Sequence, residues 1–247
     1  MRLTVVGCGD AFGSGGRANT CFWLETDAAT VALDFGATSL VALKRMGLDP
    51  NRLDAILISH LHGDHFGALP FLLLDAQFDS RRDRPLTIVG PVGLRERLTA
   101  AQEVLFPGSS KNRWRFALHV VDLPCGTPYR VAGLDLLTFE VIHPSGAPAT
   151  ALRVTDGERA LTYSGDTSWT DGLLEAARGA DLFIAECYRL ANAPANHLDL
   201  ATLKAKRALL NVPRTLLTHM SGEVLAQIAE IERDGYEVAR DGLVIEI

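Results

Sequence analysis

Four side chains that could bind a metal ion lie close together in the sequence. The segment reads Ser59-His60-Leu61-His62-Gly63-Asp64-His65, so it groups three imidazoles with one carboxylate and contains no cysteine. Nitrogen and oxygen donors suit zinc, manganese, iron or cobalt, and metal availability can decide among these ions as much as affinity does. The segment therefore predicts a metal centre without identifying its metal.

Three further candidate ligands each follow an apolar run. They are His143 after residues 136–142, Asp166 in Ser164-Gly165-Asp166-Thr167, and His219 at the end of Leu216-Leu217-Thr218-His219. Each has an ordinary explanation alone, because a single histidine can be a satisfied core residue and an aspartate can form a turn or cap a helix. Repetition of the arrangement favours a shared site. His119 lies outside these motifs and is interpreted as structural.

The elements around the first motif suggest how its side chains are positioned. Residues 53–58 form an apolar run of strand length, and residues 67–70 open a helical stretch. The motif is therefore expected in a loop that leaves the end of a buried strand. Such a loop can aim several side chains at one point while the sheet behind it stays rigid.

Strand and helix patterns alternate along the chain, which predicts an α/β fold. Strands are expected near residues 3–6, 22–25, 31–34, 56–59, 87–89, 120–123, 136–141, 151–154, 160–164, 182–185, 215–218 and 243–246, and helices near 39–46, 68–78, 93–104, 172–177, 198–210 and 224–233. Both halves place candidate ligands at strand ends. This placement favours a site between two sheets.

Composition narrows the class of protein. The 247 residues are 47% hydrophobic and no linker or low-complexity tract divides them, so a single domain over residues 1–247 is expected. A net charge of −6 argues against broad nucleic-acid binding through the whole surface. No apolar run reaches membrane-spanning length, and the four cysteines show no paired spacing. These features predict a reduced cytoplasmic protein with no membrane partner.

Together the motifs resemble the metallo-β-lactamase superfamily, whose hallmark is His-X-His-X-Asp-His followed by a later histidine, a bridging aspartate and a last histidine. The resemblance covers nearly the whole chain and implies a four-layer αβ/βα sandwich. It also implies two divalent metal ions, with zinc expected and manganese or iron as alternatives. The implied ligands are His60, His62 and His143 for one ion and Asp64, His65 and His219 for the other, with Asp166 bridging both.

Within the superfamily the chain is similar to the ribonuclease Z-like and phosphodiesterase branch. The similarity lies in Gly7-Cys8-Gly9-Asp10-Ala11, Ser164-Gly165-Asp166-Thr167, Ala185-Glu186-Cys187 and Asn196-His197-Leu198. With a histidine at position 65 and an aspartate at position 166, the chain resembles the dinuclear hydrolases more than the lactam-cleaving members. By resemblance, His197 supported by Glu186 protonates the leaving oxygen. However, Leu198-Asp199 replaces the usual Ser-Thr, and an ordinary histidine at a helix start is the alternative.

The resemblance implies hydrolysis of a small phosphodiester, or a nucleotide or RNA end, by a metal-bound hydroxide that Asp64 helps to orient. Transfer RNA is a disfavoured partner, because the connection from His143 to Asp166 leaves no room for the long arm that tRNA-processing members carry. Carboxylic esters, lactones, thioesters and sulfate esters are alternative substrates of the same site. A nonenzymatic metal- or ligand-binding role is disfavoured, since structural zinc normally stops at four ligands.

Two smaller signals concern the surface. The basic clusters at residues 81–84 and 111–115 could contact substrate, but a solvated face is favoured. Phe71-Leu72-Leu73-Leu74 is too apolar for an exposed face, so it is expected in the core or in a subunit contact. Homodimers are common among the family that the chain resembles, which favours a homodimer.

Overall fold

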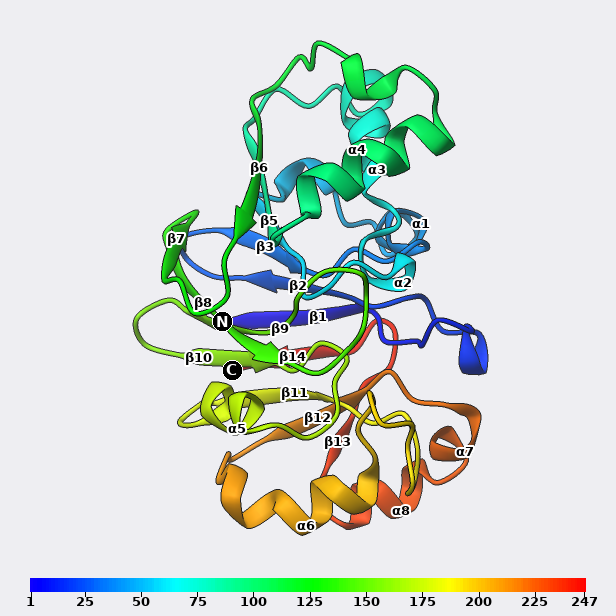
Figure 1. Cartoon of the computed structure of the whole chain (residues 1–247), viewed down its shortest axis with the longest axis vertical. Coiled ribbons are helices and arrows are strands. Elements are labelled where there is room, and N and C mark those ends of the chain that lie inside the picture. The colour runs from blue at the N-terminus through cyan, green and yellow to red at the C-terminus, as the bar shows by residue number, and fades with distance from the viewer.

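The computed structural model describes residues 1–247 as an α/β sandwich. Two seven-stranded mixed sheets have the strand orders β14-β1-β2-β3-β4-β5-β6 and β13-β12-β11-β10-β9-β8-β7. The sheets face each other, with α1 to α4 on the outer side of the first sheet and α5 to α8 on the outer side of the second (Figure 1). The expected α/β sandwich is confirmed.

The first sheet holds both ends of the chain. Its strands are β1 (Arg2–Gly7), β2 (Cys21–Glu25), β3 (Thr30–Leu33), β4 (Ala55–Leu57), β5 (Leu86–Pro91), β6 (Leu118–Leu123) and β14 (Val244–Glu246). Strands β3 to β6 are parallel, whereas β1 pairs antiparallel with β2 and β14. The parallel strands end at one edge of the sheet, which brings the loops that follow them together.

The second sheet combines an antiparallel meander with a parallel half. Its strands are β7 (Tyr129–Val131), β8 (Leu134–Val141), β9 (Ala149–Thr155), β10 (Ala160–Tyr163), β11 (Leu182–Glu186), β12 (Thr215–Thr218) and β13 (Glu237–Val238). Strands β7 to β10 are antiparallel, and β10 to β13 are parallel. The carboxyl ends of β8, β10, β11 and β12 precede residues of the candidate site.

Short helices cover the outer faces of the sheets. They are α1 (Ser39–Arg45), α2 (Gly63–Phe66), α3 (Leu69–Leu74), α4 (Leu94–Leu105), α5 (Asp171–Ala177), α6 (Leu200–Leu210), α7 (Gly222–Leu225) and α8 (Ile228–Arg233). A π-helical turn at Asp75–Asp79 and 3-10 turns at Ser14–Gly16, Pro50–Arg52 and Ser109–Lys111 complete the helical segments.

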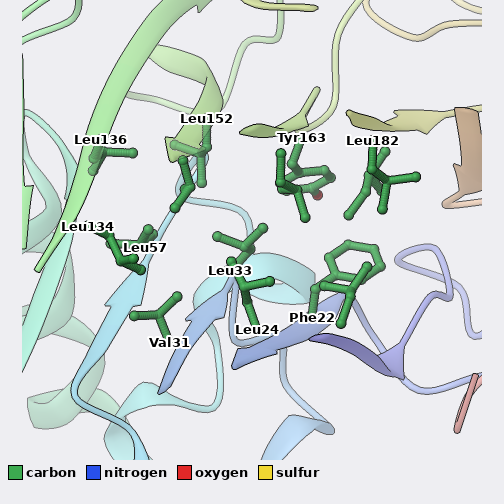
Figure 2. Close-up of a cluster of buried hydrophobic side chains, with 14 of the residues drawn as sticks. Phe22, Leu24, Val31, Leu33, Leu57, Leu134, Leu136, Leu152, Tyr163 and Leu182 are labelled. Carbon is green, nitrogen blue, oxygen red and sulfur yellow. The ribbon is translucent and has the colours of Figure 1, made fainter. Parts of the chain in front are cut away.

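The main core lies between the two sheets. Phe22 and Leu33 of the first sheet face Tyr163 and Leu182 of the second in a cluster of 24 buried residues (Figure 2). Further apolar clusters lie between each sheet and its helices. Strands β3 and β11 are buried along their whole length, because both of their faces are covered. The loops of the site therefore leave a rigid, close-packed support.

The structure corrects several expected elements. Strands β7 and β13 were not predicted. The helix expected at 68–78 is continuous but changes from α to π geometry at Asp75, whereas the helix expected at 224–233 is interrupted between α7 and α8. The first motif is only partly a loop, because Asp64 and His65 lie in α2. The His62 carbonyl accepts hydrogen bonds from the amides of His65 and Phe66 at 3.0 and 3.1 Å, which closes a helical turn inside the motif.

The structure also shows where the basic cluster at 81–84 and the apolar run at 71–74 lie. Arg82 is only 2% exposed, and its guanidinium donates to backbone carbonyls that include Leu53 and Pro85 at 2.5 Å each. The solvated interpretation of the 81–84 cluster is therefore wrong for Arg82, which ties two loops together. In the apolar run, Leu72 and Leu73 are buried, whereas Phe71 is 43% exposed. His119 is exposed on β6. None of the helices combines the length and the apolar character that a membrane span requires.

Candidate metal centre

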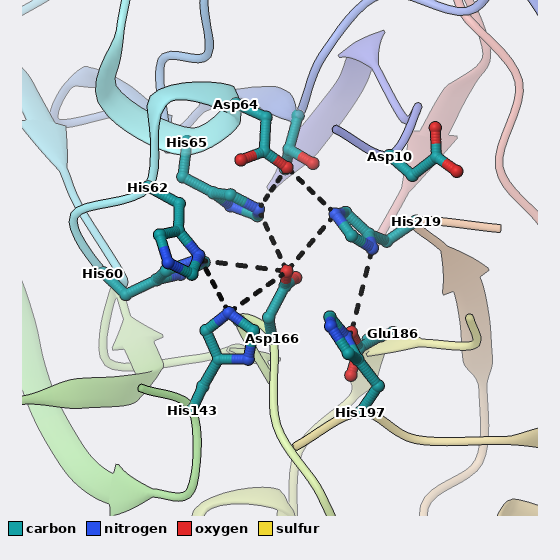
Figure 3. Close-up of polar contacts among 12 residues, drawn as sticks. Asp10, His60, His62, Asp64, His65, His143, Asp166, Glu186, His197 and His219 are labelled. Atoms are coloured by element: carbon teal, nitrogen blue, oxygen red, sulfur yellow. Dashed lines mark hydrogen bonds and ion pairs between the residues drawn. The ribbon is translucent and has the colours of Figure 1, made fainter. Parts of the chain in front are cut away.

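The structure brings all the ligand residues expected from the sequence to one point between the sheets. His60 and His62 follow β4, Asp64 and His65 lie on α2, and His143, Asp166 and His219 follow β8, β10 and β12. Figure 3 shows their side chains converging on Asp166. Loops from both sheets thus supply the cluster, as the recurring arrangement of a ligand after a strand indicates.

Asp166 is the centre of the cluster. Its Oδ2 atom lies 3.3 Å from His219 Nε2, 3.4 Å from His65 Nε2, and 3.9 Å from Nε2 of both His60 and His143. The side chain is buried, and its Oδ1 atom has no hydrogen-bond partner. A carboxylate placed in this way can contact two cations at once.

The ligand atoms fall into two groups, each spanning at most 4.8 Å: His60, His62 and His143 in one, and Asp64, His65, Asp166 and His219 in the other. His143 Nε2 lies 2.9 Å from His62 Nδ1, and Asp64 Oδ2 lies 3.1 Å from His219 Nε2. Ligands about 2.1 Å from a tetrahedral zinc ion are separated by about 3.4 Å. The spacing and the chemistry of the donors therefore fit metal ions.

Unsatisfied polar atoms support the same conclusion. The Nε2 atoms of His60 and His65 are buried without a hydrogen-bond partner. Buried polar atoms are nearly always hydrogen-bonded, so exceptions need a physical reason. Both atoms face the centre of the cluster, where a cation would accept their lone pairs.

Hydrogen bonds on the far side of the rings orient the ligands. His143 Nδ1 donates to the Asn196 carbonyl at 2.9 Å, and His65 Nδ1 donates to Asp34 Oδ2 at 2.7 Å. Such bonds fix the ring tautomer and leave Nε2 as the ligand atom.

Asp34, at the carboxyl end of β3, organises this supporting layer. Its Oδ2 atom accepts hydrogen bonds from the hydroxyls of Ser59 and Tyr163 at 2.7 and 3.0 Å, and Oδ1 accepts from the Ser59 amide at 2.7 Å. The Ser59 hydroxyl in turn lies 3.1 Å from His60 Nδ1. Sequence reasoning missed Asp34. Its only signal is a strand-end position beside β4, the strand that precedes the first motif.

Burial and charge set the protonation of the cluster. Burial holds the pKa of His60 well below its usual value, so its imidazole is neutral and able to ligate. Burial opposes ionisation of Asp166, but His219, His65 and the other imidazoles outweigh it and hold the pKa of this carboxyl well below its usual range. Asp166 is therefore ionised, and the centre attracts positive charge.

The predicted proton-donor pair, Glu186 and His197, lies beside the cluster (Figure 3). Glu186 ends β11 and is fully buried, and its Oε1 atom contacts His197 Nδ1. Its Oε2 atom accepts the amides of Thr167 and Leu198 at 3.0 and 2.9 Å. The structure thus places the two residues side by side, within reach of Asp166 and His219.

Burial shifts the two pKa values of this pair in opposite directions. Burial and the charge of Asp166 raise the pKa of Glu186 well above its usual range, whereas burial lowers the pKa of His197. Both shifts favour the uncharged forms of the two side chains, with one proton between Glu186 Oε1 and His197 Nδ1. Since His197 is then neutral, its other proton is on Nε2, which hydrogen-bonds to no protein atom.

This fold and this donor set define a metallo-hydrolase of the metallo-β-lactamase fold. A family model described as Anti-Pycsar protein Apyc1 matches residues 1–230, and the chain belongs to that family. The probable metallo-hydrolase YhfI of Bacillus subtilis is 29% identical over 230 residues, which cover 89% of this chain and 87% of YhfI.

Solved structures agree. The crystal structure of YhfI superposes with a TM-score of 0.81 at 23% identity and covers 100% of this chain and 98% of its own. The crystal structure of human tRNase Z, short form, superposes with a TM-score of 0.77 at 25% identity, and the match covers 100% of this chain and 99% of that chain. The crystal structure of a diphosphatase from the PhnP family superposes with a TM-score of 0.76 at 20% identity, and the match covers 100% of this chain and 97% of that chain. The resemblance to the superfamily and to its ribonuclease Z-like branch is confirmed.

Proposed function

We propose that this chain is a phosphodiesterase that uses two metal ions to hydrolyse small phosphodiesters. One observation carries the proposal. Asp166 belongs to one group of ligands and lies 3.9 Å from His60 and His143 of the other, and the Glu186–His197 pair lies at the edge of the same centre. Attack on phosphorus and protonation of a leaving oxygen need groups at two places around one phosphate, and this arrangement supplies both.

The relatives support phosphorus chemistry without fixing the substrate. One neighbour is a tRNase Z and another a diphosphatase, both of which break bonds to phosphorus. The described chain runs from His143 to Asp166 through β9, β10 and their short turns. No long arm that could hold a transfer RNA lies in this segment, so we propose a small substrate.

His60, His62 and His143 would hold one ion, Asp64, His65 and His219 the other, and Asp166 both. Bound in this way, two divalent ions supply Lewis-acid chemistry, which polarises a phosphoryl oxygen and acidifies water. The carboxylates of Asp64 and Asp166 would accept a hydrogen bond from the attacking water and orient it toward phosphorus.

The Glu186–His197 pair would complete the reaction. As the bond between phosphorus and the leaving oxygen breaks, His197 donates its Nε2 proton to that oxygen. The proton on Glu186 moves to Nδ1 at the same time, so the ring stays neutral. Because the two residues are in direct contact, no solvent proton is needed during the step. Afterwards a water molecule returns a proton to Nε2 of His197, and the Nδ1 proton moves back to Glu186.

The first test is turnover of bis(p-nitrophenyl) phosphate by protein loaded separately with zinc and manganese. We expect metal-dependent turnover that Asp166→Ala abolishes and Asp135→Ala, a surface control with a 58% exposed side chain, leaves intact. Protein that contains both ions and yet cleaves no phosphodiester would contradict the proposal. Ester, lactone, thioester and sulfate-ester substrates would then be tested on the same samples.

The proton-donor role of His197 has its own test. His197→Ala should slow cleavage of a dinucleotide, whose leaving group is a basic alkoxide, by about a hundred- to ten-thousandfold. Cleavage of bis(p-nitrophenyl) phosphate should fall far less, because p-nitrophenolate leaves without a proton. Equal slowing of both substrates would show that His197 is not the proton donor.

A further inference from the structure

We propose that Tyr188 is a positioning residue that holds the ring of His197 with its Nε2 atom directed at the leaving oxygen. The inference rests on the proposed function and extends it to a side chain outside the ligand set. Tyr188 follows β11 by two positions and is half-buried.

Ring contacts are the first observation. The centroids of the Tyr188 and His197 rings are 4.8 Å apart with an interplanar angle of 35°, and the His143 ring approaches His197 edge-on at 4.9 Å. Aromatic pairs at such separations attract each other beyond the area they bury. The imidazole of His197 therefore packs against the Tyr188 ring as well as against His143, a proposed metal ligand.

The backbone of Tyr188 hydrogen-bonds to the segment that contains His197 and to the segment that follows His219. Its amide donates to the carbonyl of Leu198, next to His197, at 3.0 Å. Its carbonyl accepts from the amide of Ser221, two residues after His219, at 3.3 Å. Tyr188 is thus fixed relative to the proton donor and to the second group of ligands at once.

The other contacts of Tyr188 involve its ring and not its hydroxyl. The Arg189 guanidinium carbon lies 5.5 Å from the ring centroid, and Arg189 pairs with Glu223 at 3.6 Å. No protein atom hydrogen-bonds to the Tyr188 hydroxyl. The flat ring is therefore the part of this side chain that positions His197.

His197 needs such a support because of where it lies. It belongs to the irregular segment between β11 and α6, so no regular element restricts its side chain. Glu186 contacts only Nδ1, and one contact of this kind still permits the imidazole to tilt. A tilt moves Nε2, and a displacement of about 1 Å can slow catalysis about a hundredfold. The Tyr188 ring, which lies nearest, restricts this tilt together with the rings of His143 and His219.

The test compares Tyr188→Leu and Tyr188→Phe in the metal-loaded protein. Tyr188→Leu should slow dinucleotide cleavage about ten- to a hundredfold and cleavage of bis(p-nitrophenyl) phosphate by less than about twofold. Tyr188→Phe should restore both rates, since it keeps the ring. Tyr129→Leu, which removes a half-buried tyrosine from β7, is the matched control and should leave both rates unchanged.

A double mutant separates positioning from general loss of structure. In a His197→Ala background, Tyr188→Leu should have no further effect on dinucleotide cleavage, because it acts through His197. An equal effect in both backgrounds, or equal slowing of both substrates by Tyr188→Leu alone, would overturn the proposal.

A crystal structure of Tyr188→Leu keeps this inference separate from the proposed function. We expect the His197 ring to be rotated or disordered while Glu186 and the ligand cluster are unchanged. An unmoved His197 ring would overturn the positioning role whatever substrate the protein cleaves. A rotated ring, in a protein that cleaves no phosphodiester, would support the positioning role and reject only the proposed reaction.

Discussion

Asp34 is the single residue that connects the supports of the two ligand groups. It contacts His65 directly and reaches His60 through the Ser59 hydroxyl, so one buried carboxylate orients a ligand in each group. Its φ angle of 57° is left-handed, a conformation that aspartate and asparagine tolerate better than most residues. Replacement by asparagine therefore keeps the backbone and changes only the hydrogen bonding.

Asp34→Asn should weaken zinc binding by about ten- to a hundredfold. The amide has one oxygen where the carboxylate has two, so it cannot accept all the hydrogen bonds from Ser59, Tyr163 and His65. Competition with a chromophoric chelator measures the affinity. Asp27→Asn makes the same change at an exposed position and should bind zinc like the unaltered protein. Equal affinities for the two variants would show that Asp34 does not support the ligands.

The contrast between Asp34 and the ligands shows what residue spacing can predict. His60, His62, Asp64 and His65 stand out because several donors share one short segment. Asp34 is a single aspartate after a strand, a position where turns commonly have one. Only the pairing of β3 with β4 places it against the ligands, and that pairing is long-range information.

At the scale of elements, two helix caps stabilise helices that pack on the second sheet. Asp199 caps α6 by accepting the Thr202 amide at 2.7 Å, and Thr170 caps α5 by accepting the Leu173 amide at 3.0 Å. Both helices pack on the second sheet, and the cap of α6 is two residues from His197. A cap of this kind contributes about 1 kcal/mol to the free energy of unfolding.

The two caps should respond differently to pH. Burial raises the pKa of Asp199, but hydrogen bonds from Thr202 outweigh it and lower the pKa below its usual value. The charged form is thus favoured in the folded state, so its stabilisation is complete above the unfolded pKa of about 3.9 and is lost as the pH falls through the folded pKa. The uncharged Thr170 cap has no such dependence.

Asp199→Ala should therefore cost about 1 kcal/mol at pH 7 and progressively less below about pH 4. Thr170→Ala is the matched control, and its cost should stay constant over the same range. Urea unfolding of both variants in the presence of chelator measures the difference. A cost of Asp199→Ala that does not change with pH would contradict a charged cap.

Strands with sustained apolar runs were predicted from the sequence, whereas β13 and α2 were missed because each is too short to show a period. Strands such as β8 and β11 contain apolar runs that predict a strand without information about tertiary packing. Strand β13 has two residues, too few for any period to show, and it exists because β12 offers it a partner. Helix α2 is likewise a single turn, closed by the His62 carbonyl within the ligand motif.

At the scale of the whole molecule, the site depends on the packing of one sheet against the other. His60, His62, Asp64 and His65 follow strands of the first sheet, whereas His143, Asp166 and His219 follow strands of the second. The apolar cluster shared by the sheets holds these two sets in register. Because an unfolded chain does not hold these side chains together, metal binding and folding are coupled.

Zinc should therefore stabilise the whole fold. At a free concentration a hundred times its dissociation constant, one bound ion adds about 2.7 kcal/mol to the free energy of unfolding. For a chain of this length that is about 5–10 °C in melting temperature. Differential scanning calorimetry should show this rise with zinc, its reversal by chelator, and little change with magnesium, which prefers oxygen ligands. Asp166→Ala removes the carboxylate that lies between the two groups and should lose most of the rise. An undiminished rise would place the stabilising zinc outside this centre.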